Sequence, residues 1–206
     1  MSLFRGNKLA FTLIEISVSL FIIIIVVSLA VANYNTGYSG INLVSGQQSL
    51  FQNMKLAQSY ALSYRSYNDA LPAYWGIYLA TSSSNFYFFA DVNGNGVYDE
   101  GEADPFLGGR DIYLSVDTEI SGFNPVTSAI SVLFESGTGR MFVYDIGASA
   151  FDNNPWAIEL KDKRVDLARL IVVEPPTNID MQNCSCSDAS LFCCSFCSAG
   201  DSCTIF

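Results

Sequence analysis

The sequence predicts an α+β fold in which a long N-terminal helix, membrane-spanning in its first half, packs on an antiparallel β-rich globular head. Residues 11–32 are almost entirely apolar, and a helical period continues to about Arg65. From Ala73 onward, short aromatic and β-branched segments alternate with turn residues, which is typical of hairpins. The predicted divisions are a polar segment (1–10), the helix (11–66), the head (67–181) and a cysteine-rich tail (182–206).

Residues 11–32 have the length of a membrane-spanning helix. They number 22 and contain one charged residue, Glu15. At ~1.5 Å per residue the helix reaches ~33 Å, against a hydrocarbon thickness of ~30 Å. Arg5 and Lys8 precede this segment, and the next basic residue is Lys55, so we expect the N-terminus to stay in the cytoplasm and the head to lie outside.

Glu15 is unexpected in an apolar helix, because an unpaired carboxylate there costs several kcal/mol or stays protonated. A plain membrane anchor has no use for such a residue. A partner for this carboxylate is therefore expected, and the residues on the N-terminal side of Glu15 indicate one.

The basic leader, the small residue Ala10 and the motif F-T-L-I-E at 11–15 closely resemble the class III signal of type IV prepilins and type II secretion pseudopilins. The resemblance implies a pilin-like fold, cleavage between Ala10 and Phe11 by prepilin peptidase, and N-methylation of Phe11. It also implies that Glu15 pairs with the Phe11 amine of a neighbouring subunit during assembly on an inner-membrane platform. The long helix and hairpin-rich head are most similar to H-type minor pseudopilins and related minor pilins.

Composition argues against several functional classes. The chain has a net charge of −10, and a chain cut after Ala10 would carry −12, because Arg5 and Lys8 are lost. Such a surface repels phosphate backbones, so no direct nucleic-acid binding is expected. There is no histidine and no glycine-rich phosphate loop, and nothing places two carboxylates in an apolar cleft, so we do not expect an enzyme.

Turn-forming residues at 33–40 predict a bend in the helix or an interruption of it. The helical period resumes near Ser45, and its apolar stripe is expected to be covered by a sheet or, as an alternative, by a partner groove. The stripe comprises Leu50, Met54, Ala57 and Ala61. The predicted strands are 74–81, 85–90, 111–120, 129–135, 140–146, 156–161 and 169–174.

Residues 91–102, DVNGNGVYDEGE, satisfy the calcium-loop pattern D-x-[DN]-x-[DN]-G-x5-E. The pattern predicts a calcium ion bound by six residues, with Gly96 permitting the sharp turn. The alternative is an ordinary Asn–Gly hairpin connection, which leaves the acids at both ends unexplained. The predicted ligands are Asp91, Asn93, Asn95, Val97 (through its carbonyl), Asp99 and Glu102.

All six cysteines fall within the last 23 residues. Outside the cytoplasm thiols oxidise, so disulfides are favoured over the alternative, a zinc cluster. Six cysteines allow 15 pairings, and the sequence does not choose among them. The candidates are Cys184, Cys186, Cys193, Cys194, Cys197 and Cys203.

The expected function is that of a structural subunit of a type IV pilus or a type II secretion pseudopilus. We expect it first in the cytoplasmic membrane and then in an extracytoplasmic fibre. A major pilin is the alternative within this class. The alternative from another class is a membrane-anchored calcium-binding surface or adhesion protein that does not polymerise.

Overall fold

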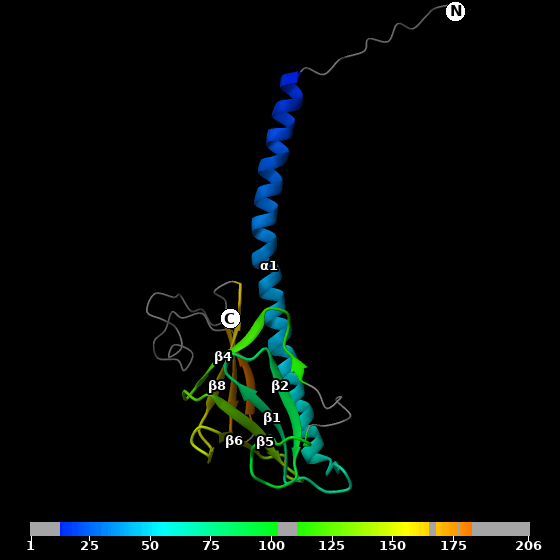
Figure 1. The fold of residues 1–206 in the computed structure, drawn as a ribbon, viewed down its shortest axis with the longest axis vertical. Coiled ribbons are helices and arrows are strands. Elements are labelled where there is room, and N and C mark those ends of the chain that lie inside the picture. Colours follow the sequence, from blue (N-terminus) through cyan, green and yellow to red (C-terminus); the bar gives the residue numbers. More distant parts are fainter. Residues whose placement is uncertain (1–12, 103–110, 165–167, 177, 183–206) are drawn as a thin grey trace, which may run out of the picture. The chain divides into compact units, whose positions relative to one another are not determined.

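The computed structural model describes residues 13–102, 111–164, 168–176 and 178–182, except for the side chains of residues 30–39 and 182. The described residues form one helix and ten strands (Figure 1). The chain divides into two compact units, Met1–Tyr38 and Ser39–Phe206. The boundary falls within the helix.

The helix α1, Leu13–Leu62, is 50 residues long. The predicted interruption at 33–40 was wrong, because the backbone is helical through those positions. Continuous i→i−4 backbone bonding does not require an apolar or regular sequence, and a single glycine costs a helix only about 1 kcal/mol. The helix ends where Tyr64 takes a φ of 51°, and the amide of Gly137 donates to the carbonyl of Ala61 at 2.8 Å.

The unit Met1–Tyr38 contains the apolar part of α1. Its described apolar side chains are solvent-exposed in this single chain, from 44% for Ile25 to 85% for Leu13. Ser17, Ser19 and Ser28 each donate a hydroxyl to the carbonyl four residues earlier, which satisfies these polar groups within the helix. Among the residues described with their side chains, which end at Leu29 in this part of α1, no helix is both long and apolar enough to cross a membrane.

The unit Ser39–Phe206 contains two antiparallel sheets (Figure 1). The first has the order β3-β2-β1-β5-β6-β7, and the second has the order β10-β9-β8-β4. The strands of the first sheet are β1 (Tyr74–Ala80), β2 (Asn85–Asp91), β3 (Ile112–Tyr113), β5 (Ala129–Glu135), β6 (Met141–Asp145) and β7 (Ala150–Asp152). The strands of the second are β4 (Thr118–Asn124), β8 (Trp156–Asp162), β9 (Ala168–Glu174) and β10 (Asn178–Gln182).

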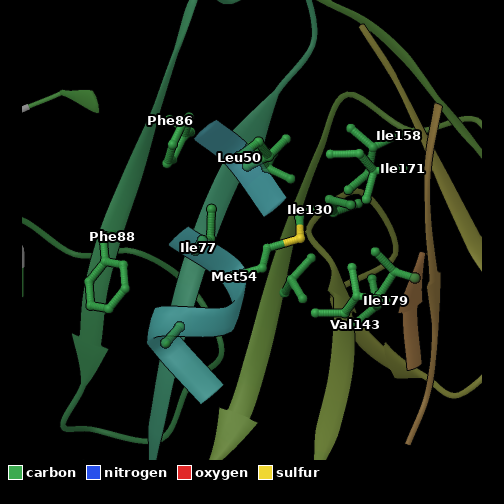
Figure 2. Close-up of a cluster of buried hydrophobic side chains, with 14 of the residues drawn as sticks. Leu50, Met54, Ile77, Phe86, Phe88, Ile130, Val143, Ile158, Ile171 and Ile179 are labelled. Atoms are coloured by element: carbon green, nitrogen blue, oxygen red, sulfur yellow. The ribbon is translucent and has the colours of Figure 1, made fainter. Parts of the chain in front are cut away.

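The hydrophobic core lies among the two sheets and the end of α1. Figure 2 shows Leu50 and Met54 of α1 among side chains of both sheets. The four predicted stripe residues of the helix are fully buried. The side chain of Gln47 fixes the helix to the second sheet, because its Nε2 donates to the Leu170 carbonyl at 2.7 Å. Core side chains of the sheets include Ile77, Phe86, Phe88, Ile130, Val143, Ile158, Ile171 and Ile179.

These findings correct the predicted fold class, a pilin-like α+β fold with a membrane-spanning long helix packed on a β head. The globular unit is mostly antiparallel β-sheet, and only residues 39–62 of α1 belong to it. Five of its buried apolar residues come from α1, while strands and connecting segments supply all the others. The expected membrane-spanning half also finds no support among the described residues. The physical reason is that an apolar period shows only which face of a helix is buried, and the described strands supply many more buried apolar residues than the helix does.

Candidate functional site

The predicted calcium loop begins at Asp91, the last residue of β2. Asp91 has no exposed surface, and its carboxylate accepts backbone N–H groups of the loop. Its Oδ1 accepts from Gly94 at 2.6 Å and from Asn95 at 3.2 Å, while its Oδ2 accepts from Gly96 at 2.8 Å. The loop is therefore wound around the Asp91 carboxylate. Gly94 and Gly96 permit this path, since their φ angles are 75° and 79°.

The two asparagines continue this winding. The amide of Asn95 donates to Asn93 Oδ1 at 2.9 Å, and the amide of Val97 donates to Asn95 Oδ1 at 2.7 Å. Both side-chain amide nitrogens donate to Asp99 Oδ2 at 2.8 Å. Each Oδ1 retains a second lone pair, which is the kind of ligand that calcium takes.

Glu102 closes the loop onto its own start. Its Oε1 accepts from the amide of Val92 and its Oε2 from that of Asp99, both at 3.2 Å. Its backbone carbonyl accepts from the amide of Ala90 at 2.9 Å. Glu102 is 8% exposed, so the carboxylates at both ends of the loop are buried.

The electrostatics of these two carboxylates favour a cation. Burial raises the pKa of Asp91 above its usual value, and the nearby Asp99 raises it further. Burial likewise raises the pKa of Glu102, to which Asp91 and Asp99 add. The ionised forms of Asp91 and Glu102 are thus disfavoured by burial and by neighbouring carboxylates, and a divalent cation beside them would offset this cost.

The structure brings together five of the six predicted ligand residues by hydrogen bonds, namely Asp91, Asn93, Asn95, Asp99 and Glu102. Val97 is tied in through its amide, while its carbonyl was the expected ligand. Across the described parts of the chain, no three His, Cys, Asp or Glu side chains are grouped closely enough to hold a metal ion. Calcium binding here would therefore depend on the asparagine oxygens and on backbone carbonyls as well as on the acids.

The loop lies over the face of the first sheet that is directed away from the core. On this outer face, Tyr98 stacks on Tyr87 with ring centroids 4.7 Å apart and meets Phe89 edge-on at 5.8 Å. At the end of the loop, the hydroxyl of Tyr67 donates to the Gly101 carbonyl at 2.5 Å. These aromatic contacts were not predicted from the sequence. Phe89 gave a signal, since it has apolar neighbours on both sides and so breaks the alternation of a half-buried strand.

The other predicted site residues lie at the two ends of the chain. Glu15 lies in the first turn of α1, where its carbonyl accepts the hydroxyl of Ser19 at 2.8 Å. It shares one face of the helix with Ile16, Ser19, Leu20 and Ile23. The predicted cleavage residues Ala10 and Phe11 lie outside the described residues, and so do all six cysteines.

The chain was compared with protein families, curated proteins and solved structures. No family model matches the chain, and neither the curated proteins nor the solved structures contain a significant match. The functional assignment must therefore come from the chain's own residues.

Proposed function

We propose that this protein is a non-enzymatic structural subunit, a minor pilin or pseudopilin, of a type IV pilus or a type II secretion pseudopilus. The observation that carries the proposal is Glu15, a carboxylate in the first turn of an otherwise apolar helical segment, four residues after Phe11. A carboxylate at that distance from a newly formed N-terminal amine can pair with the amine of a second copy.

The exposure of the first part of α1 supports this proposal. Apolar side chains surround Glu15 on the same face of the helix, and those of residues 13–29 are largely exposed in the single chain. Exposed apolar surface of this extent marks an interaction site. Copies of the same helix would bury it in a non-closing, head-to-tail assembly, which produces a fibre.

The proposal includes a processing pathway and a location. The precursor is held at the cytoplasmic membrane with residues 1–10 in the cytoplasm. Prepilin peptidase cleaves after Ala10 and methylates Phe11, and an inner-membrane assembly platform then adds the subunit to an extracytoplasmic fibre. The partners are therefore other pilin or pseudopilin subunits, the peptidase and the platform.

The intact mass of the protein isolated from native membranes tests the proposal. We expect a chain that begins at Phe11 and carries one additional methyl group on its amine. Expression beside an inactive peptidase is the control, and it should retain Met1 or Ser2. A main form that retains the leader while the peptidase is active would overturn the pilin assignment.

A second candidate function is calcium binding by residues 91–102, in a surface or adhesion protein that does not polymerise. The winding of the loop around the buried Asp91 carboxylate favours calcium binding. Calcium binding is also compatible with a pilin, where it would order a loop of the head. The two functions differ at Glu15, because only the fibre subunit depends on that residue.

A further inference from the structure

The outer face of the first sheet carries a group of neighbouring tyrosines, Tyr78, Tyr87 and Tyr98, which we call the tyrosine cluster. Tyr78 and Tyr87 are cross-strand partners with ring centroids 5.9 Å apart, and Tyr98 lies 6.1 Å from Tyr78. All three are partly exposed. The cluster is therefore a partly exposed group of aromatic residues, whereas Trp75 and Ile77 of the same strand β1 are buried on the core side.

The carboxylate of Asp111 lies beside the tyrosine cluster. Burial raises the pKa of the Tyr87 hydroxyl, and the neighbouring Asp111 raises it further. Asp111 directly precedes β3, in which Ile112 pairs with Phe86 and Tyr113 with Asn85, so the antiparallel register places Asp111 beside Tyr87. The register and the shift agree that the Asp111 carboxylate lies close to the Tyr87 hydroxyl, where it opposes a negative charge. The cluster is therefore both aromatic and bordered by negative charge.

One cation of the chain already lies on the same outer face. The guanidinium of Arg140 lies over the ring of Phe142, with 5.5 Å between its Cζ atom and the ring centroid. Phe142 is on the outer face because it pairs with Leu133, which pairs with Gly76, the residue between the core-facing Trp75 and Ile77. This contact shows that the aromatic side chains of this face accept a guanidinium.

We propose that the tyrosine cluster with Asp111 is a docking surface for an arginine-bearing segment of a partner protein. A guanidinium is planar and weakly hydrated, so it stacks on aromatic rings and donates two parallel hydrogen bonds to a carboxylate. Both halves of that recognition are present here within one surface. A chain with a net charge of −10 adds long-range attraction for a basic segment. The proposal rests neither on fibre assembly nor on calcium binding.

Binding of a labelled peptide to the full chain in a neutral, non-ionic detergent tests the proposal. The probe is an eight-residue peptide of alternating arginine and glycine, measured by fluorescence anisotropy at about 150 mM salt, where surface charges are screened beyond ~8 Å. We expect saturable binding of the arginine peptide, several-fold weaker binding of the matching lysine peptide, and none of the glutamate peptide. Equal affinity for the lysine and arginine peptides would overturn the proposal, since it would indicate attraction by net charge alone.

Matched variants separate the cluster from net charge. Tyr87→Leu should weaken binding about fivefold, the value for ~1 kcal/mol of cation–π stacking, while Tyr87→Phe should stay within twofold of the wild type. Asp111→Asn should weaken binding about three- to tenfold. The controls are Tyr64→Leu and Asp180→Asn, exposed residues on α1's C-terminal side and on β10.

The variants are compared only after thermal melting shows that each one is folded. Tyr87→Phe and Asp111→Asn are conservative, so they report on binding even if Tyr87→Leu fails to fold. An equal loss of affinity in Asp111→Asn and Asp180→Asn would show that binding depends on the net charge of the chain, and the docking surface would then be rejected. A loss in Tyr87→Phe equal to that in Tyr87→Leu would also reject it, because the hydroxyl and not the aromatic ring would then account for the binding.

Discussion

Gly96 of the candidate calcium loop lies directly on the ring of Tyr144 in β6. A Cβ atom added to Gly96 would come within 2.8 Å of that ring. The loop follows β2, and Tyr144 is far along the chain, in a strand on the other side of β1 and β5. The contact therefore ties the conformation of the loop to the outer face of the whole first sheet.

This contact predicts the effect of Gly96→Ala. The new methyl group would strain a residue at a φ of 79° and also displace the Tyr144 ring, so we expect a loss of about 1–3 kcal/mol in the free energy of unfolding. Chemical denaturation of the fragment 39–206, a compact unit of the chain, measures it. Gly94→Ala is the matched control, since its φ is 75° but its nearest neighbour would be 3.6 Å away. Equal losses in the two variants would mean that Tyr144 does not constrain the loop.

Gly76 in β1 predicts a second packing effect on the same face. Its missing side chain leaves room for Leu133 and Phe89, and an added Cβ would lie 2.6 Å from the former and 2.9 Å from the latter. Because both neighbours are fully buried, Gly76→Ala should destabilise the fragment by about 1–3 kcal/mol. Gly76→Ala should cost less stability in a Leu133→Ala background than in the wild type, because the smaller side chain at position 133 leaves room for the new methyl group. Additive effects would contradict the contact.

The local sequence pattern predicts some of the strands and not others. Six predicted strands lie within two residues of observed ones, because their aromatic and β-branched residues match the period of a sheet. The sequence predicts one strand over residues 111–120, whereas β3 and β4 are separate and belong to different sheets. The short edge strand β7 and the strand β10, which follows Pro175 and Pro176, were missed. Edge strands carry weak patterns, since only one side of each is paired.

The sequence likewise predicts only part of the candidate site. The residues of the loop follow from its motif, since acids and amides at fixed spacings wind a chain about one carboxylate. The packing of the loop against Tyr87 and Tyr144 depends on which strands are neighbours in the sheet, and no local sequence pattern contains that information. Long-range register, rather than local chemistry, was the missing part.

Glu15→Gln tests the assembly part of the proposed function. Loss of the charge should leave membrane insertion intact or improve it, because the cost of a carboxylate in an apolar segment disappears. Recruitment into fibres should fall, because the Phe11 amine loses its ion-pair partner. Sheared fibres are assayed for the variant by immunoblotting, with Ser19→Ala on the same helix face as the control. Co-purification of the variant at wild-type levels would show that Glu15 has no role in assembly.

The raised pKa values of Asp91 and Glu102 predict a pH dependence of stability. A carboxyl group whose pKa is raised in the folded state binds protons there that the unfolded chain has released. The free energy of unfolding should therefore fall as pH rises through the interval between the ordinary pKa values, 3.8 and 4.5, and the higher folded ones. Urea denaturation without divalent cations, from pH 4 to pH 7, should show a smaller fall in Asp91→Asn than in the wild type. A fall of the same size in both would exclude Asp91 as its source, and Asp180→Asn controls for net charge.

Calcium should stabilise the head through residues 91–102. Three carboxylates and two asparagines suggest a Kd of order 10⁻⁴ to 10⁻³ M, in the range of extracellular modules. At ~1 mM calcium and a Kd of ~0.1 mM, linkage gives a stabilisation of ~1.4 kcal/mol. The fragment 39–206 should thus melt at a higher temperature with calcium than with chelator, and Asp91→Ala or Glu102→Ala should abolish the difference.

The control variant Asp180→Ala, on β10 in the second sheet, should retain the difference in melting temperature. A magnesium series separates specific binding from general charge screening, because calcium accepts more oxygen ligands in a less regular geometry than the smaller magnesium ion does. If several millimolar calcium left the melting temperature of the wild type unchanged, residues 91–102 would be an ordinary turn, held by its own hydrogen bonds.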